Sequence, residues 1–69
     1  MRYDSRALTI ARLTHGYSQR QLADRAKVSH TTIQSAERGI YTPRPESVLA
    51  LADALGLSPL DLYTEDVAA

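Results

Sequence analysis

Cysteine is absent from the sequence, as are tryptophan and phenylalanine, and glycine and proline occur only three times each. A chain without cysteine forms no disulfide framework and no thiolate metal site, and it suits a reducing compartment such as the cytoplasm. Long apolar runs are also missing: no stretch approaches the roughly 18 apolar residues of a membrane span, and the charged start MRYDSRALTIARL does not resemble a signal peptide. We therefore expect a soluble, cytoplasmic protein.

The chain of 69 residues has room for one small domain, which we expect to span residues 1–69. A domain of this size buries only about 60% of the surface of its unfolded chain, so its core must be compact. Terminal residues are commonly poorly ordered, and we expect the tail TEDVAA to be frayed from about residue 64.

The net charge of the whole chain is zero, but it differs sharply between two parts of the sequence. Residues 1–44 contain all eight basic side chains and three acidic ones, a net charge of +5. Residues 45–69 contain five acidic side chains and no basic one, a net charge of −5. Such asymmetry indicates that one part faces a polyanion, although chance clustering in a short chain gives the same pattern.

Start and stop signals predict two helices in the first third of the chain. Asp4 is a suitable N-cap for a helix over about residues 5–14. Ser18 and Gln21 match the S-x-x-Q capping box, so a second helix begins at Gln19. Its buried face is formed by Leu22, Ala23 and Ala26.

A third helix follows closely, with Ser29 as its N-cap and its end before Gly39. Only Lys27 and Val28, together with the cap, separate it from the second helix. Helices joined by so short a turn do not lie antiparallel, and we expect them to cross steeply as helix-turn-helix pairs do.

Two further helices are predicted in the acidic part. One begins with Pro45 at its first position, and the last runs from the cap Ser58 to about Tyr63. The fourth helix has a broad apolar stripe, formed by Val48, Leu49, Leu51, Ala52 and Leu55. No strand signal is present, so the predicted fold class is all-α with five helices.

The third predicted helix has an unusual outer face. On a period of 3.6 residues, Ile33 and Ala36 point inward, with Glu37 beside them. The side chains on the opposite side carry no net charge and are rich in donors and acceptors: His30, Thr31, Gln34 and Ser35. Ordinary solvated faces carry more Glu and Lys, which are better helix formers. Base edges in a DNA major groove offer a use for these residue types, since Gln pairs with adenine and Thr packs on the thymine methyl group.

The stretch LTHGYSQRQLADRAKVSHTTIQSAERG, followed by PRPESVLALADALGLSPLDLY, resembles the phage-repressor or Cro-type helix-turn-helix family, often called the XRE family. The matching motifs are SQ at the second helix, VS at Val28–Ser29, ERG at Glu37–Gly39 and LALADALGLS in the fourth helix. The resemblance covers roughly residues 8–63. It implies a five-helix transcriptional regulator, a phage or prophage repressor or a Cro-like protein. Its third helix would lie in the major groove of double-stranded operator DNA, usually as a homodimer.

Carried over position by position, the resemblance implies base contacts from His30, Thr31, Gln34 and Ser35. It implies that Gln19 holds a backbone phosphate at the start of the second helix, which suits an anion. Three further residues would lie near the DNA backbone: Ser29, Thr32 and Arg38.

Other cations are candidates for phosphate contacts, each with a solvated role as its alternative: Arg20, Lys27 and Arg44. Lys27 stands where relatives often have glycine, and a left-handed conformation there would cost about 1–2 kcal/mol. Arg2 and Arg6 either supply an N-terminal arm or serve solubility. Tyr41 either bonds a phosphate or packs under its loop.

Arg12 matches an arginine that in many members of the family pairs with the glutamate of the E-[RN]-G turn, here Glu37. A buried pair of this kind ties the first helix to the end of the third, and loss of one partner costs about 3–5 kcal/mol. We assign both residues to architecture, with a phosphate contact by Arg12 as the alternative.

Catalytic and metal sites are not expected. Neither His15 nor His30 has a further ligand at a metal-type spacing, and no cofactor motif is present. Ser29 beside His30 is no nucleophile–base pair, because a cap serine bonds backbone N–H groups and no third group follows. The sequence therefore predicts a binding protein and no enzyme.

A protein-binding role remains the main alternative: an antitoxin or adaptor that uses the same fold to hold a protein partner. The acidic part offers apolar residues for such a surface, or equally for a homodimer seam: Leu60, Leu62, Tyr63 and Val67. Sequence-independent binding of nucleic acid is less attractive, because the third helix carries few positive charges.

Overall fold

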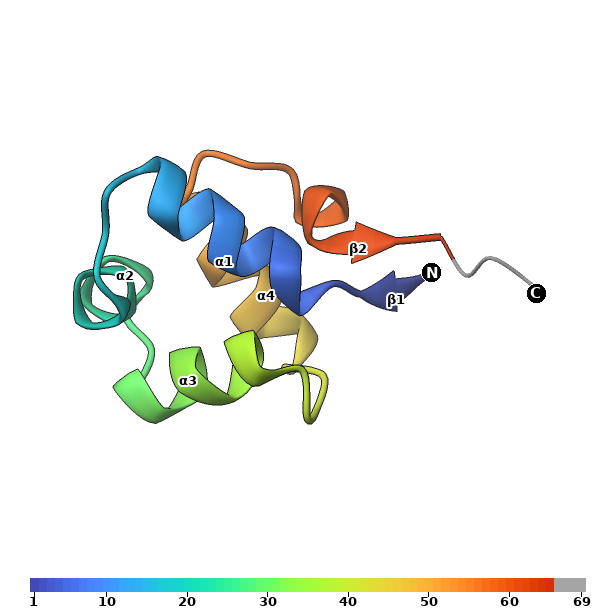
Figure 1. Cartoon of the computed structure of the whole chain (residues 1–69), viewed down its shortest axis with the longest axis horizontal. Helices are drawn as coiled ribbons and strands as arrows, with labels where there is room; N and C mark the ends of the chain where they lie inside the picture. Colours follow the sequence, from blue (N-terminus) through green and yellow to red (C-terminus); the bar gives the residue numbers. More distant parts are fainter. Residues whose placement is uncertain (66–69) are drawn as a thin grey trace.

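A computed structural model describes residues 1–65 of the chain, most of which lie in four α-helices. The helices are α1 (Ser5–Thr14), α2 (Gln19–Ala26), α3 (His30–Arg38) and α4 (Pro45–Ala54). A short 3-10 helix, η1 (Pro59–Leu62), and two strands, β1 (Arg2–Tyr3) and β2 (Tyr63–Thr64), complete the described part (Figure 1). The all-α helix-turn-helix class predicted from the sequence is confirmed.

The helices begin where local capping predicts. The Asp4 carboxylate accepts hydrogen bonds from the first backbone N–H groups of α1. At α2, the Ser18 hydroxyl accepts from the Gln21 N–H at 3.0 Å, and the Gln21 side chain accepts from the Ser18 N–H at 2.8 Å. Pro45 occupies the first turn of α4, where its missing N–H costs nothing. Each start is thus determined by residues within one turn of it.

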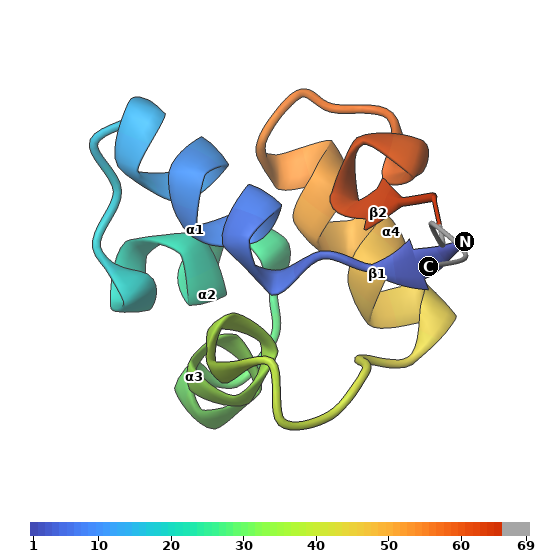
Figure 2. The ribbon, with the colours of Figure 1, turned by 45° about the vertical axis from the view of Figure 1, so that its right-hand side comes forward.

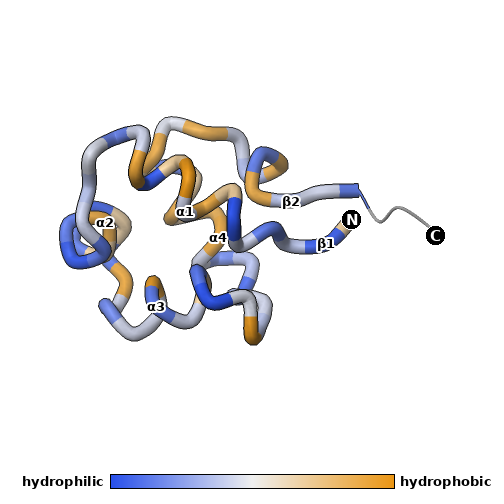
Figure 3. Tube along the Cα trace, viewed as in Figure 1, coloured by the Kyte–Doolittle hydropathy of each residue, from blue (hydrophilic) through white to orange (hydrophobic). Residues whose placement is uncertain are grey.

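One apolar core joins the elements. Every α-helix and η1 contribute large side chains that are almost completely buried: Leu8, Leu22, Ile33, Val48, Leu51, Leu55 and Leu62. Along the trace, the apolar positions of α1 and α4 gather in the middle of the molecule (Figure 3). No helix within residues 1–65 is long and apolar enough to cross a membrane.

The α2–α3 pair crosses steeply, since α2 is seen nearly end-on in the view that shows α3 lengthwise (Figure 1). The turn depends on Lys27, the C-cap of α2, which adopts the left-handed conformation with φ 58° and ψ 41°. Its N–H bonds the carbonyls of the last turn of α2. The Val28 N–H donates to the Ala23 carbonyl at 3.0 Å. The chain therefore turns within three residues and leaves α3 at one edge of the molecule (Figure 2).

The fifth predicted helix is wrong as an α-helix. Residues Pro59–Leu62 form a single turn of 3-10 helix, although Ser58 and Asp61 make the expected capping box. The turn ends because Tyr63 is extended, with φ −122° and ψ 154°, and enters β2.

A two-stranded antiparallel sheet, which the sequence did not indicate, joins the two ends of the described chain (Figure 2). Arg2 is opposite Thr64, and Tyr3 is opposite Tyr63. Thr64, where we expected the frayed tail to begin, is therefore paired. Residues 66–69 of that tail, which include Val67 of the predicted protein-binding surface or homodimer seam, lie outside the described residues.

Leu49 was wrongly placed in the apolar stripe of α4. Its side chain is 55% exposed, whereas Val48 and Ala52 are buried. Successive residues in an α-helix are about 100° apart, so the position after Val48 points away from the face that meets the core. Leu62, predicted to lie on a protein-binding surface or a homodimer seam, is in contrast fully buried.

Candidate nucleic-acid interface

The two sides of α3 differ completely. Ile33 and Ala36 have no exposed surface, and the helix packs against α1 and α2. The outer side carries the four residues that the sequence predicts as base contacts. Thr31 and Gln34 are exposed, whereas His30 and Ser35 are partly covered. These four donor and acceptor groups are therefore held on a single helix face and remain accessible to a partner.

The start of α3 carries a pair of hydroxyl groups. The Ser29 Oγ accepts a hydrogen bond from the Thr32 N–H at 3.1 Å. The same oxygen lies 2.8 Å from the Thr32 Oγ1, so one hydroxyl proton is used between the two side chains. Each hydroxyl has only one O–H to donate. One O–H therefore remains for an external acceptor such as a phosphate oxygen.

An ion pair between Arg12 and Glu37 joins α1 to the last turn of α3. The Arg12 Nε donates to one carboxylate oxygen at 2.6 Å and the Nη2 to the other at 3.1 Å, a two-pronged contact. The side chains are only 13% and 8% exposed. The Arg12 Nη1 also donates to the Tyr17 carbonyl at 2.8 Å. The structure thus places Arg12 inside the fold, committed to protein acceptors.

Gln19, predicted to hold a phosphate, stands at the first position of α2 and is partly buried. Its Nε2 donates to the Glu37 Oε1 at 3.3 Å. The carboxylate that fixes Arg12 therefore also orients the Gln19 amide and links the start of α2 to the end of α3. The amide has a second N–H and a carbonyl oxygen, and both remain available to a ligand.

A surface hollow of about 430 Å³ lies where α1, α2 and α3 meet. Three residues of the predicted site line it. Gln34 is a predicted base contact, and Gln19 and Arg38 are predicted contacts with the DNA backbone. Thr9 and Glu37 complete its lining. Residues distant in the sequence are thus brought to one place beside the outer face of α3.

The remaining predicted phosphate contacts are all exposed cations at the ends of helices. Arg20 lies in the first turn of α2, and Lys27 is the C-cap of that helix. Arg38 ends α3, and Arg44 is the N-cap of α4. The structure leaves each of them accessible.

Two residues near α3 were missed by the sequence analysis. Thr9 lies one turn before Arg12 on α1, and this spacing could have placed it above the ion pair. Tyr3 donates its hydroxyl to the Ala36 carbonyl in α3 at 3.1 Å, a contact with no local signal. Burial raises the pKa of Tyr3 above its ordinary value of 10.0, and the charge of Glu37 raises it further. Tyr3 is therefore a neutral donor over the ordinary pH range.

The comparison with protein families identifies this arrangement. A sequence model described as helix-turn-helix matches residues 8–62, which is most of the chain. The chain belongs to the helix-turn-helix family. The matching model is of the XRE type, and this helix-turn-helix protein is therefore a DNA-binding regulator of transcription.

The same fold occurs in proteins of known structure. The restriction-modification controller protein C.AhdI from Aeromonas hydrophila has a TM-score of 0.81 and 29% sequence identity. The similarity covers 86% of this chain and 89% of that one. A hydroxyethylphosphonate dioxygenase variant also has a TM-score of 0.81, with 25% identity, but 99% of this chain corresponds to only 15% of the dioxygenase chain. No curated protein matched the sequence.

Proposed function

We propose that the chain is a sequence-specific transcriptional regulator of the phage-repressor or Cro type, in which α3 lies in the major groove of its operator. One observation carries this proposal: α3 buries Ile33 and Ala36 completely, yet presents an uncharged donor and acceptor face outward. A groove about 12 Å wide admits one α-helix, and each base pair there displays its own pattern of donors and acceptors.

Chemistry assigns the base contacts. Gln34, exposed at the centre of the face, suits adenine, because its amide can donate to N7 and accept from the N6 amino group. The Thr31 methyl group suits the thymine methyl group. His30 and Ser35 complete the face with groups that can donate or accept.

Phosphate contacts would position this helix without specifying a sequence. Gln19 at the start of α2 is the strongest candidate, because its amide is oriented by Glu37 and lies where N–H groups and the helix dipole favour an anion. The other proposed contacts are polar side chains at or near the ends of α2, α3 and α4: Arg20, Lys27, Ser29, Thr32, Arg38 and Arg44.

A homodimer on a two-fold operator follows from the same proposal, with half-sites about 34–36 Å apart, one turn of the duplex. The duplex of a bacterial or phage-infected cell lies in the cytoplasm, where we propose that the protein acts. C.AhdI, to which the chain is similar, is a controller protein of a restriction-modification system. Control of transcription is the role that this similarity supports.

The experiment that tests the proposal is selection of binding sites from random duplex DNA by the wild-type protein. We expect one enriched motif with two related half-sites. Affinity for that motif should fall with salt by a log–log slope of about −0.9 per phosphate neutralised. Enrichment of no motif, together with a flat salt dependence, would contradict sequence-specific binding.

Two exposed leucines favour a second candidate function, in which the acidic part binds a protein. Leu49 is 55% and Leu60 is 63% exposed, and α4 and η1 are in contact. This surface would be covered either by a second copy of the chain in a homodimer or by a protein partner such as a toxin. Mass measurement of the purified protein at several concentrations separates them, since only self-association changes the mass without an added partner.

A further inference from the structure

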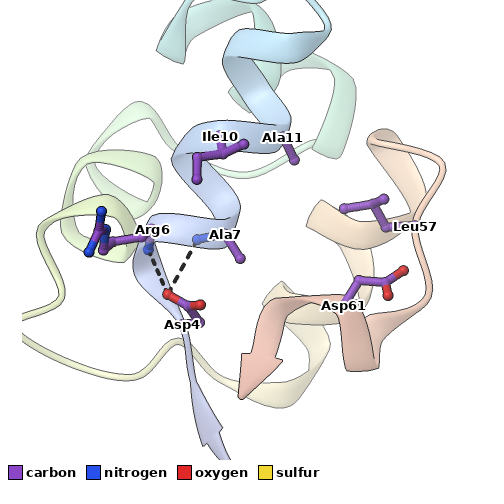
Figure 4. A pocket seen from close by; sticks show the side chains of 7 residues that line it. All are labelled: Asp4, Arg6, Ala7, Ile10, Ala11, Leu57 and Asp61. Atoms are coloured by element: carbon purple, nitrogen blue, oxygen red, sulfur yellow. Dashed lines mark hydrogen bonds between the residues drawn. The ribbon is translucent and has the colours of Figure 1, made fainter.

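An apolar surface hollow lies between α1 and the segment that leads into η1 (Figure 4). Ala7, Ile10 and Ala11 form its α1 side, and Leu57 lies across from them. Its volume is about 460 Å³, and the Ile10 side chain beside it is 60% exposed. We call it the α1 hollow. An exposed apolar side chain and an apolar depression thus lie next to each other on one surface.

Charged groups of opposite sign stand on the two sides of the α1 hollow. Figure 4 shows the Arg6 side chain on one side of α1 and the Asp61 carboxylate across the hollow from it. The exposed Arg6 guanidinium forms no ion pair within residues 1–65. The Asp61 Oδ2 accepts from the Ser58 N–H at 3.0 Å, which leaves the Oδ1 of this exposed side chain for a further donor.

The third charged group at the α1 hollow, Asp4, is already used by α1. Its Oδ1 accepts from the backbone N–H groups of Arg6, at 3.0 Å, and Ala7, at 3.3 Å. A carboxylate at this end of a helix also offsets the positive end of the helix dipole. One cation and one anion therefore remain for an external partner, on either side of an apolar floor.

We propose that a second copy of the chain docks on the α1 hollow about a two-fold axis. Ile10 of each copy fills the hollow of the other, between Ala7 and Leu57. Arg6 of each copy pairs with Asp61 of the other. A two-fold contact makes each of these pairings twice, because residue i meets residue j and residue j meets residue i.

The charges at the rim favour a second copy over other occupants. A surface that carries one available cation and one available anion satisfies both when it meets its own two-fold image. A purely basic partner would leave Arg6 without a counter-ion, and a purely acidic partner would do the same to Asp61. A small apolar ligand would cover Ile10 but would pair with neither charge. The α1 hollow is thus complementary to itself.

This contact is distinct from the homodimer proposed on one operator. Thr9 and Arg12 lie on the side of α1 that meets Glu37 of α3, whereas Ala7 and Ala11 line the α1 hollow. Positions 7 and 9 are about 200° apart around a helix axis, so the hollow and α3 lie on opposite sides of α1. Figures 1 and 2 agree, since in both views the segment after α4 lies at the top of the molecule and α3 at the bottom.

Two copies joined through their α1 hollows carry their α3 helices on opposite outer sides. Such a pair can hold two duplex segments at once, whereas a homodimer on one operator directs both α3 helices to the same duplex. This bridging rests on the proposed function, since it requires α3 to bind DNA. The docking itself does not.

Analytical ultracentrifugation without DNA tests the docking, with Ile10→Gln compared to the wild type. We expect the wild type to self-associate, and the substitution to weaken one step of self-association about tenfold or more, because two isoleucine side chains leave water in each pair. Urea unfolding at low concentration should match the wild type, since Ile10 is largely exposed.

Leu13→Gln is the matched control. Leu13 is also 60% exposed and lies on α1, but it does not line the α1 hollow. We expect its self-association to remain close to that of the wild type. Equal losses in the two variants, or a wild-type protein that stays monomeric at every concentration, would overturn the proposal.

Charge reversal tests the pairing of Arg6 with Asp61. Arg6→Glu and Asp61→Lys should each weaken the same step about tenfold or more, because each pair then contains two like-charge contacts. An equimolar mixture should associate as the wild type does, since a mixed pair restores two contacts of opposite charge. A mixture no stronger than either variant alone would refute this pairing. If Asp61→Lys unfolds for lack of its cap on η1, the Ile10 comparison still decides the docking.

Capture of a second duplex tests the bridging. Wild-type protein loaded on a surface-bound operator duplex should retain a second, labelled operator duplex from solution. Ile10→Gln should bind the first duplex equally well and retain less of the second. Equal retention by the two proteins would refute bridging through the α1 hollow. A wild-type protein that selects no operator motif would instead refute the proposed function, while the mass measurements would still test the docking.

Discussion

Replacement of Glu37 by alanine is the most informative perturbation of the fold that carries α3. The change removes the acceptor of two hydrogen bonds from Arg12 and one from Gln19. The Arg12 guanidinium, only 13% exposed, is then left with the Tyr17 carbonyl. Breaking a buried pair in this way costs about 3–5 kcal/mol, because an uncompensated charge stays inside.

This loss is large for so small a domain. Folded proteins are stable by roughly 0.05–0.15 kcal/mol per residue, so 69 residues provide on the order of 3–10 kcal/mol. Glu37→Ala should therefore be partly unfolded in the absence of DNA. Glu37→Gln keeps one acceptor for Arg12, and we expect it to lose about 1.5–3 kcal/mol, the usual worth of a hydrogen bond to a charged group.

Urea unfolding followed by circular dichroism measures these losses, with Arg12→Met/Glu37→Leu as the control. Apolar residues in place of both partners leave no stranded charge, so this double variant should be more stable than Glu37→Ala. A loss below about 1 kcal/mol in Glu37→Ala would refute the ion pair as a stabilising element. So would a double variant no more stable than the single one.

Three further substitutions test the backbone and the N-terminal contact. Lys27→Gly should raise the free energy of unfolding by about 0.5–1 kcal/mol in chemical denaturation, because glycine adopts the left-handed conformation without strain. Gly39→Ala should lower it by at least about 1 kcal/mol, since φ is +73° and the added Cβ would crowd Ser5. Tyr3→Phe should cost about 1 kcal/mol at neutral pH by removing the hydrogen bond to Ala36. The pKa of Tyr3 is raised in the folded protein, so the unfolded chain ionises first as the pH rises. The contribution of Tyr3 to the free energy of unfolding is therefore complete below pH 10.0 and is lost as the pH rises above that value. When unfolding is followed against pH, this alkaline loss should be smaller in the phenylalanine variant.

The parts of the fold that depend on neighbouring residues were predictable. Asp4, Ser18 and Ser29 cap helices through contacts within three residues, and these contacts are visible in the sequence as spacing. The inward and outward sides of α3 follow in the same way from helical periodicity. The starts of the helices and the candidate site on α3 could therefore be placed before the structure.

Long-range pairing could not be predicted in this way. The strand β2 forms because Tyr63 and Thr64 meet residues at the other end of the chain, and strands of two residues carry no periodic signal. The same pairing ends η1 after one turn, which is why the fifth α-helix was wrong. Tyr3 bonds a carbonyl 33 residues away, so this contact also depends on the tertiary structure.

The most direct test of base reading by α3 compares the DNA motifs selected by the wild type, Gln34→Ala and Gln19→Ala from the same random duplex pool. Gln34→Ala should lose about 1–3 kcal/mol of discrimination at one position of each half-site, while the other positions are retained. Gln19→Ala should bind all sequences more weakly and select the wild-type motif. A Gln34→Ala motif identical to that of the wild type at every position would show that the outer face of α3 does not read bases.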